Sequence, residues 1–250
     1  MSALLVRLAG PMQSWGVQSR FTIRDTGLEP SKSGVIGLVC AALGRPRAAP
    51  LDDLAALRMG VRCDREGRLE RDYHTAGGTR PGREYGVRKA DGKSADTVVS
   101  ERFYLADADF LVGLEGDRLL LDDIDAHLLR PHWPLSLGRK AFVPAQAVRV
   151  GVRDEALEPA LGRVPWQART VREAADVRAA SRRGQPHQLR LVLDATAGPD
   201  TETRWDVPLS FAGGARHFAL RHIRMTFMPL DESLITEPDH VPLPSRPQSA

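Results

Sequence analysis

The order of apolar patterns along residues 1–152 restricts the possible folds more than any other feature of the sequence. A short β-type run at residues 4–9 precedes residues 33–43, where apolar side chains recur with the 3.6-residue period of a helix. Ser31 or Ser33 can cap the first turn of that helix, and Gly44 can end it. The pattern therefore begins with a strand, a long polar loop over 10–33, and a helix.

The apolar runs that follow continue the alternation of strands and helices. A short helix is expected at 52–57, strands at 59–63 and 69–74 joined as an antiparallel pair through the turn at 64–67, and a further strand at 103–112. A helix ending near residue 130 and a strand at 147–152 complete the series. The order β-α-β-β-α-β predicts an α+β, ferredoxin-like fold of the RNA-recognition type over residues 1–152.

Two other parts of the chain fall outside this domain. Residues 75–100 are polar, basic and glycine-bearing, with too few apolar residues for a core, so we expect an arm or long hairpin. Residues 153–235 contain strand patterns at 189–195, 203–211 and 217–227, and predict a smaller β-rich unit. The segment 181–186 is expected to be a mobile loop, and the proline-rich residues 236–250 a disordered tail.

The basic residues of this chain are almost all arginine. Only 4 of the 35 lysines and arginines are lysine, against 32 acidic residues and a net charge of +3. Arginine binds phosphate with two donors and stacks on flat rings, which suits a nucleic-acid partner, although codon bias explains such an excess equally well. Acidic residues concentrate between Asp107 and Asp125, where we expect a partner contact or intramolecular pairing.

Neither cysteine lies in a metal-ligand spacing, so Cys40 and Cys63 are expected to be buried thiols. No apolar stretch reaches the length of about 18 residues that crosses a bilayer, and no charged leader opens the chain, so we expect a cytoplasmic protein. No motif for a cofactor or a metal is present, and none is expected.

Enzyme signatures are weak. The sequence lacks a nucleophile elbow, a metalloprotease motif and a phosphate-binding Walker loop. Asp107 and Asp109 would share one face of a strand, and His74 lies where the arm leaves the sheet. These three residues leave open an acid/base enzyme with a compact pocket, although salt bridging or a partner interface explains the aspartates better.

Basic residues gather on four connections of the predicted sheet. The first loop carries Arg20, Arg24 and Lys32. The arm carries Arg80, Arg83, Tyr85, Arg88 and Lys89, and the end of the arm carries Arg102 with Tyr104. The glycine-flanked loop after the second helix carries Arg139 with Lys140. The first group leads into a helix whose N-terminal amides can receive an anion. Their convergence favours RNA binding.

Five segments in order resemble one known family across about residues 3–145. They are the segment from Leu8 to Gly16 (LAGPMQSWG), that from Ser33 to Gly44 (SGVIGLVCAALG), RDYHT at 71–75, RFYLADA at 102–108 and LGRK at 137–140. Together they are similar to the CasD subunits of type I-E CRISPR Cascade complexes, within the repeat-associated RNA-binding superfamily. Beyond Val152 the similarity is loose.

This resemblance implies a ferredoxin-like domain with a thumb hairpin, here about 75–101, in a ribonucleoprotein of antiviral defence. Such subunits cap the 5′ end of the guide RNA, hold its repeat-derived 5′ handle, and pack against a backbone subunit and the large subunit, touching target DNA only indirectly. In the family, Arg102 matches the arginine at the base of the thumb that reaches the handle, Gln13, Ser14 and Trp15 fall on the first loop, and Arg139 with Lys140 correspond to the glycine-rich loop after the second helix. Ser33 at the start of the helix and His74 at the root of the arm are further RNA-binding candidates.

Two mechanisms follow from the resemblance. The first is a non-catalytic clamp, in which amides and arginines neutralise phosphates while aromatic rings stack on bases. The second is a metal-independent endoribonuclease, as in a related branch whose subunit cuts the repeat RNA with a tyrosine, a lysine and a histidine. No lysine here has a histidine neighbour in the sequence, which favours the clamp.

Overall fold

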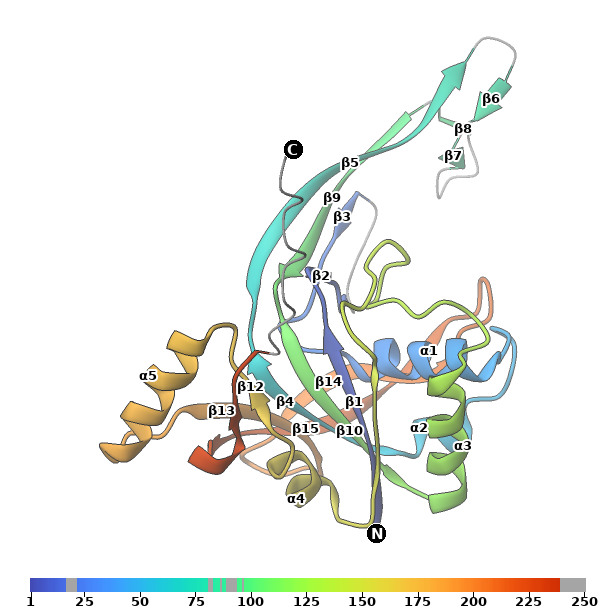
Figure 1. The fold of residues 1–250 in the computed structure, drawn as a ribbon. Coiled ribbons are helices and arrows are strands. Elements are labelled where there is room, and N and C mark those ends of the chain that lie inside the picture. The colour runs from blue at the N-terminus through green and yellow to red at the C-terminus, as the bar shows by residue number, and fades with distance from the viewer. Residues whose placement is uncertain (17–21, 81–82, 86, 89–93, 96, 239–250) are drawn as a thin grey trace, which may run out of the picture.

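A seven-stranded antiparallel sheet forms the body of the protein (Figure 1). The computed structural model describes residues 1–16, 22–80, 83–85, 87–88, 94–95 and 97–238, and the side chains of 1–16, 22–77 and 97–238. The strand order is β11-β1-β10-β4-β13-β15-β14. Their bounds are β1 Ser2–Ala9, β4 Arg58–Arg65, β10 Asp109–Gly116, β11 Arg149–Arg153, β13 Gln188–Ala195, β14 Glu202–Ser210 and β15 His217–Pro229.

Four of these strands and two helices make the ferredoxin-like domain that the sequence predicts. Along the chain, β1, α1 (Lys32–Leu43), β4, β10, α3 (Arg118–Leu129) and β11 follow in the expected order. The strand β1 pairs with β10 and β11 on its two sides, and β10 pairs with β4, all antiparallel. The predicted fold class is thereby confirmed.

Local signals in the sequence set the ends of α1. Ser31 takes an extended conformation and its hydroxyl accepts a hydrogen bond from the Gly34 N–H, so it is the N-cap. Gly44 adopts the left-handed conformation at φ 71°, where its N–H bonds to the Cys40 carbonyl and ends the helix. The short helix α2 (Asp52–Ala55) follows.

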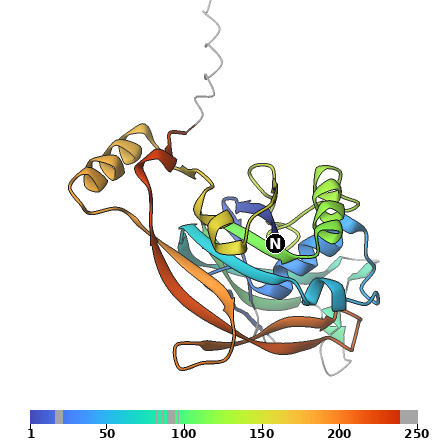
Figure 2. The same ribbon diagram turned by 90° about the horizontal axis from the view of Figure 1, so that it is seen from below.

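Both faces of the sheet are covered at its strand β1. Alternate residues of β1 separate to the two sides, because side chains of a strand point in turn to opposite faces. Leu4, Val6 and Leu8 join the main core under α1 and α3, which lie side by side in Figure 2. Leu5 and its neighbour Ala3 join a second core under α4 (Leu157–Gly162).

The C-terminal strands extend the sheet of the first domain. β13 pairs antiparallel with β4, β15 with β13, and β14 with β15. The predicted division at residue 152 therefore does not coincide with a break in the sheet. The sequence did not indicate α4 or α5 (Val171–Arg182), and the last two residues of α5 lie in the segment 181–186 that was expected to be a loop.

A small third core lies under α5. It holds Trp166 of β12 (Trp166–Gln167), Ala174 of α5 and Ile235 of β16 (Ile235–Thr236), which pairs in parallel with β12. A short 3-10 helix, Glu232–Leu234, precedes β16.

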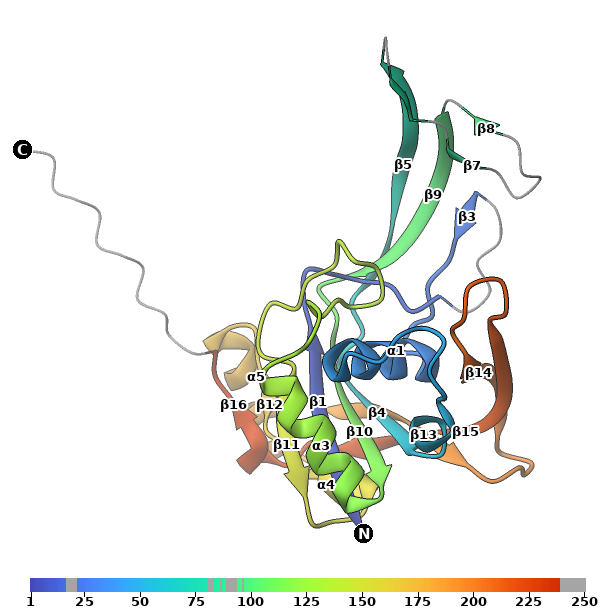
Figure 3. The ribbon, with the colours of Figure 1, turned by 90° about the vertical axis from the view of Figure 1, so that its right-hand side faces the viewer.

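A long two-stranded ribbon projects from the body, and we call it the arm (Figures 1 and 3). It consists of β5 (Arg68–Arg80) and β9 (Thr97–Ala106), which pair antiparallel from Arg68 with Ala106 to Gly77 with Thr97. The short strands β2 (Met12–Gln13) and β3 (Ile23–Arg24) pair with β9. Near the tip, β6 (Arg83–Tyr85) pairs with β5, and β7 (Val87–Arg88) pairs with β8 (Ser94–Ala95). The arm begins about seven residues earlier than expected.

Two local expectations are wrong. The predicted pair at 59–63 and 69–74 does not form, because β4 pairs with β10 and β13 while β5 pairs with β9 in another sheet. The predicted strand at 103–112 is two strands, because Asp107 takes a left-handed conformation at φ 56° and separates β9 from β10. In both cases the path of the chain changes direction within a run of β-forming residues.

Among the described residues, no helix is long and apolar enough to cross a membrane. The greater part of the expected tail, residues 239–250, lies outside the described residues.

A candidate RNA interface at the root of the arm

Three arginines that the sequence placed on separate connections meet at the root of the arm. Arg24 of β3 and Arg102 of β9 are register neighbours, so their side chains stand on the same face of the ribbon. The Arg139 guanidinium donates a hydrogen bond to the Arg24 carbonyl at 3.1 Å. We call Arg24, Arg102 and Arg139 the arginine cluster. Like charges in neighbouring strand positions repel, so this arrangement favours an anion between them.

The pKa of Arg139 is lowered in this cluster. Burial of the guanidinium is the main cause that lowers its pKa, and repulsion by Arg102 and then by Arg24 lowers it further. Asp72 and Asp25 offset part of this effect. Within the described side chains, none of the three guanidinium groups forms an ion pair with a carboxylate.

Two aromatic rings pack next to Arg139, one in direct contact with its guanidinium group and the second against the first ring. Its guanidinium carbon lies 5.5 Å from the centre of the Phe142 ring, a cation–π contact, and Phe142 lies 6.0 Å from Tyr104 of β9. Phe142 is buried and Tyr104 is half-buried. The sequence predicted Tyr104 but missed Phe142, whose only signal was its position three residues after Arg139.

A glycine brings this loop against the first loop. Gly138 has φ 88°, and a Cβ atom there would lie 1.8 Å from the Ser14 carbonyl oxygen. The Ser14 N–H donates to the Leu137 carbonyl at 3.1 Å, which fixes the same contact. Only glycine allows this backbone to approach so closely, and the approach places Arg139 beside the arm.

The predicted RNA-contacting residues of the first loop are turned inward. The Gln13 amide is fully buried and donates to the Leu8 and Ala108 carbonyls, both at 2.8 Å, while its oxygen accepts from the Trp15 indole at 3.1 Å. The Ser14 hydroxyl bonds to the carbonyls of Asp25 and Phe103. These hydrogen bonds join the first loop to β1, to β9 and to the turn before β10, so the side chains of Gln13 and Ser14 hold the loop in place.

Lys32 is also placed differently from the prediction. Its ammonium group is buried and pairs with Asp194 at 3.2 Å, and its backbone N–H donates to the Asp206 carboxylate at 2.7 Å. Two N-terminal amides of α1, those of Lys32 and Gly34, are therefore bonded to an internal carboxylate and to the Ser31 hydroxyl. Ser33 is half-buried, with its hydroxyl 3.4 Å from that of Ser31. The sequence could not show this, because Asp206 lies on β14, far along the chain.

The remaining predicted residues fall into two groups. His74 lies on the arm on the same face as Arg102, with its ring 3.6 Å from Asp72, and Lys140 is exposed beside Arg139. Arg20 and Lys89 lie outside the described residues, and only the backbone is described at Arg80, Arg83, Tyr85 and Arg88.

The acidic stretch pairs within the molecule, one of the two outcomes expected for it. Asp109 is buried against Arg7 at 3.1 Å, and burial raises its pKa although Arg7 lowers it in part. Asp125 pairs with Arg149 at 2.6 Å. Asp107 is exposed in the turn before β10 and does not share a strand face with Asp109. The two aspartates and His74 therefore do not converge on one compact pocket.

Both thiols are buried, as expected. Burial raises the pKa of Cys40 to about 11 and raises that of Cys63 further. Within the described part of the chain, no group of three or more histidine, cysteine or acidic side chains is arranged to hold a metal ion.

Comparisons with known proteins agree on one family. The model of the family described as CRISPR-associated protein (Cas_Cas5) matches residues 3–224. The chain is 36% identical over 155 residues to the CRISPR system Cascade subunit CasD of Escherichia coli K12, a match that spans 56% of this chain and 66% of that protein.

Two solved structures are similar over nearly the whole fold. A chain of a structure titled "CRISPR RNA-guided surveillance complex" matches with a TM-score of 0.77 and 36% identity, covering 95% of each chain. A structure titled "Crystal structure of Cas protein" matches with a TM-score of 0.67 and 37% identity, covering 91% of this chain and 95% of that one. This chain therefore belongs to the Cas5 family of CRISPR-associated proteins.

Proposed function

We propose that this protein is a non-catalytic RNA-binding subunit of a CRISPR surveillance complex, which holds the repeat-derived 5′ handle of the guide RNA at the root of the arm. The observation that carries the proposal is the arginine cluster, where three cations from three separate connections meet without a carboxylate partner among the described side chains. A phosphodiester backbone supplies the missing charge, and arginine binds it with directed donors.

The geometry also supports a single-stranded ligand. The cluster lies where an extended ribbon leaves the body, so a strand can follow the ribbon while its phosphates meet Arg24, Arg102 and Arg139 (Figure 3). Tyr104 is half-buried beside them. Single-stranded RNA fits such a groove because its bases can unstack and contact rings or guanidinium planes. The similarity to a Cascade subunit supports guide RNA and other Cascade proteins as the partners.

The second candidate function is metal-independent cleavage of the repeat RNA. The histidine that the sequence offered, His74, pairs with Asp72 on the arm, and its backbone carbonyl accepts from the Ser100 hydroxyl. Lys32 is held by Asp194 in the body. Lys32 is therefore not free to act with His74, which supports the clamp over the nuclease.

Equilibrium binding to a repeat-derived RNA tests the clamp. We expect Arg102→Gln in the full chain to lower the affinity about tenfold, or about 1.4 kcal/mol, because one charged phosphate contact is lost. Arg172→Gln is the matched control, since that side chain is 92% exposed on α5, away from the arm. We expect the control to bind within twofold of the unchanged protein.

Equal affinities for the two variants would remove Arg102 from the interface. The same RNA, incubated with the protein in EDTA and resolved on a denaturing gel, separates the two candidate functions. The clamp predicts intact RNA, and specific cleavage at one position of the repeat would establish the nuclease instead.

A further inference from the structure

The face of the arm that carries the arginine cluster also carries a carboxylate. Asp72 of β5 lies directly across from Arg102 of β9, and Arg102 lies directly across from Arg24 of β3. Residues paired across strands share a face, so these three side chains form one row across the ribbon, with two positive charges followed by one negative charge. Asp72 is also near enough to Arg139 to offset part of the lowering of its pKa, which burial mainly causes. The proposed phosphate site therefore ends at an acid.

Asp72 and Arg102 do not pair with each other. The Arg102 Nε donates a hydrogen bond to the Ser100 hydroxyl on its own strand at 3.0 Å. The Asp72 carboxylate, 49% exposed, contacts the His74 ring at 3.6 Å, which is longer than a hydrogen bond. Within the described side chains, the oxygens of Asp72 thus keep their capacity to accept hydrogen bonds.

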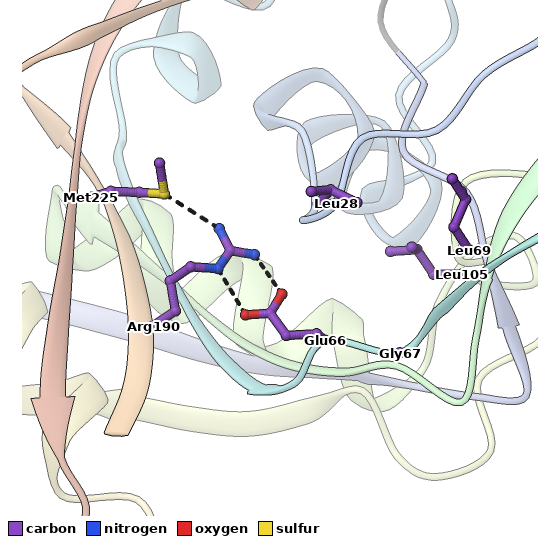
Figure 4. A pocket seen from close by; sticks show the side chains of 7 residues that line it. All are labelled: Leu28, Glu66, Gly67, Leu69, Leu105, Arg190 and Met225. Carbon is purple, nitrogen blue, oxygen red and sulfur yellow. Dashed lines mark hydrogen bonds and ion pairs between the residues drawn. The ribbon is translucent and has the colours of Figure 1, made fainter. Parts of the chain in front are cut away.

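Opposite charges elsewhere at the root of the arm do pair. A pocket of about 390 Å³ lies there beside β5, and in it the Arg190 guanidinium donates two hydrogen bonds to the Glu66 carboxylate, at 2.8 and 2.6 Å (Figure 4). On the opposite face of the ribbon, Arg71 pairs with Glu101 at 3.3 Å. Opposite charges in neighbouring strand positions attract in this way. The separation of the acid and the arginine in the row therefore leaves both groups available to a ligand.

The row fits a nucleotide better than it fits a phosphate alone. A carboxylate repels phosphate, so an acid at this position weakens a site that binds only the RNA backbone. Neighbouring strands lie about 4.8 Å apart, so a nucleotide held by its phosphate over β3 and β9 can place its base over β5.

The chemistry of a carboxylate selects the base. An ionised carboxylate accepts hydrogen bonds and donates none, so the base has to present N–H groups. Single-stranded RNA exposes the Watson–Crick edges of its bases to such contacts. Guanine is the base whose Watson–Crick edge presents two N–H donors side by side, from N1 and N2, and these match the two oxygens of one carboxylate.

We propose that Asp72 binds the Watson–Crick edge of a guanine in the 5′ handle, next to the phosphate that the arginine cluster holds. This inference rests on the proposed function, because it requires the handle to lie on this face of the arm. The arginines then supply affinity that does not depend on sequence, and Asp72 supplies selection of a base.

Replacement of guanine by inosine tests this assignment, because inosine lacks the amino group at N2 and keeps the rest of the base. Each guanine of the repeat-derived handle is replaced in turn, and the equilibrium affinity of the full chain for each RNA is measured. We expect one such replacement to lower the affinity about fivefold, the effect of one lost hydrogen bond. With Asp72→Asn the same replacement should no longer lower the affinity, because the amide nitrogen presents a donor to the donor at N2.

Glu101→Gln is the matched control. It removes one negative charge from the same ribbon, but the Glu101 carboxylate, 41% exposed, lies on the opposite face and pairs with Arg71. We expect this variant to keep the inosine effect of about fivefold.

The assignment is overturned by a handle without guanine, by an unchanged protein that tolerates inosine at every position, or by an inosine effect that persists in Asp72→Asn. If Asp72→Asn instead raises the affinity for every RNA alike, Asp72 only offsets the charge of the arginine cluster. Binding that Arg102→Gln weakens, without any inosine effect, would leave the proposed function standing and refute this inference alone. Absence of RNA binding by the unchanged protein would overturn both.

Discussion

At the scale of single residues, the backbone conformation of Gly138 decides where Arg139 lies. The positive φ of Gly138 and its approach to the Ser14 carbonyl bring the Arg139 guanidinium to the Arg24 carbonyl. The position of this charge beside Arg102 thus depends on a residue that carries no side chain.

A Gly138→Ala substitution tests this dependence. A methyl group would overlap the Ser14 carbonyl oxygen, so the loop must move. We expect unfolding in urea to show a loss of about 2 kcal/mol or more, together with weaker RNA binding because Arg139 is displaced.

Gly184→Ala provides the matched control. Gly184 has nearly the same positive φ, 76°, but nothing lies within 4 Å of its Cβ position. That variant is expected to lose only about 1 kcal/mol, from backbone conformation alone, and to keep its RNA affinity. Similar losses in the two variants would mean that the contact with Ser14 does not constrain the loop.

Residue identity alone predicted part of the candidate site. Arg24, Arg102 and Arg139 were predicted from their positions on connections, and the structure brings them together. The motif around Gln13 and Trp15 was equally visible in the sequence, but those side chains are buried. A sequence motif identifies a functionally important segment but does not show whether its side chains face solvent or the interior. That depends on hydrogen bonds to residues that are distant in the sequence.

At the scale of elements, the N-terminus of α1 joins the first domain to the C-terminal strands. Asp206 of β14 accepts from the Lys32 N–H and from two nitrogens of Arg221 on β15, at 2.6 and 2.9 Å. A carboxylate at this end is favourable because the first amides of a helix carry partial positive charge. This buried network holds α1 against the edge of the sheet.

Replacing Asp206 with alanine should therefore destabilise the fold. Arg221 and the first turn of α1 would lose a buried partner, and we expect the free energy of unfolding in urea to fall by about 3 kcal/mol. Glu202→Ala on the same strand, whose carboxylate is half exposed and pairs with Arg204, should cost less than about 0.5 kcal/mol. A loss below 1 kcal/mol for Asp206→Ala would contradict this account of the network.

Elements with strong local signals were predicted well, and their long-range pairing was not. The caps of α1 at Ser31 and Gly44 were visible in the sequence because each acts within one turn. The partners of β4 were missed because β10 and β13 are distant in the sequence, whereas β5 follows β4 directly after a turn. The helix α5 was missed because few of its residues are strongly apolar, and only Ala174 among them is fully buried.

At the scale of the whole molecule, the C-terminal strands belong to the sheet of the first domain. The order of strands and helices predicted the ferredoxin-like part and the projecting arm, but not that β13, β15 and β14 would extend the same sheet. That extension supplies Arg190 and Met225 to the pocket at the root of the arm. The C-terminal segment, which the sequence left without a role, thereby contributes to the surface at the root of the arm.

The salt dependence of RNA binding tests the central claim most directly. If the arginine cluster neutralises phosphates, binding releases counterions, and log K falls with log salt by about 0.7 for each single-strand phosphate. The triple variant Arg24→Gln, Arg102→Gln, Arg139→Gln should reduce the magnitude of this slope by about 2. A matched triple variant at Arg172, Arg182 and Arg183 around α5 removes the same net charge and should leave the slope unchanged. Equal slopes for the two triple variants would contradict the claim that this cluster holds the RNA.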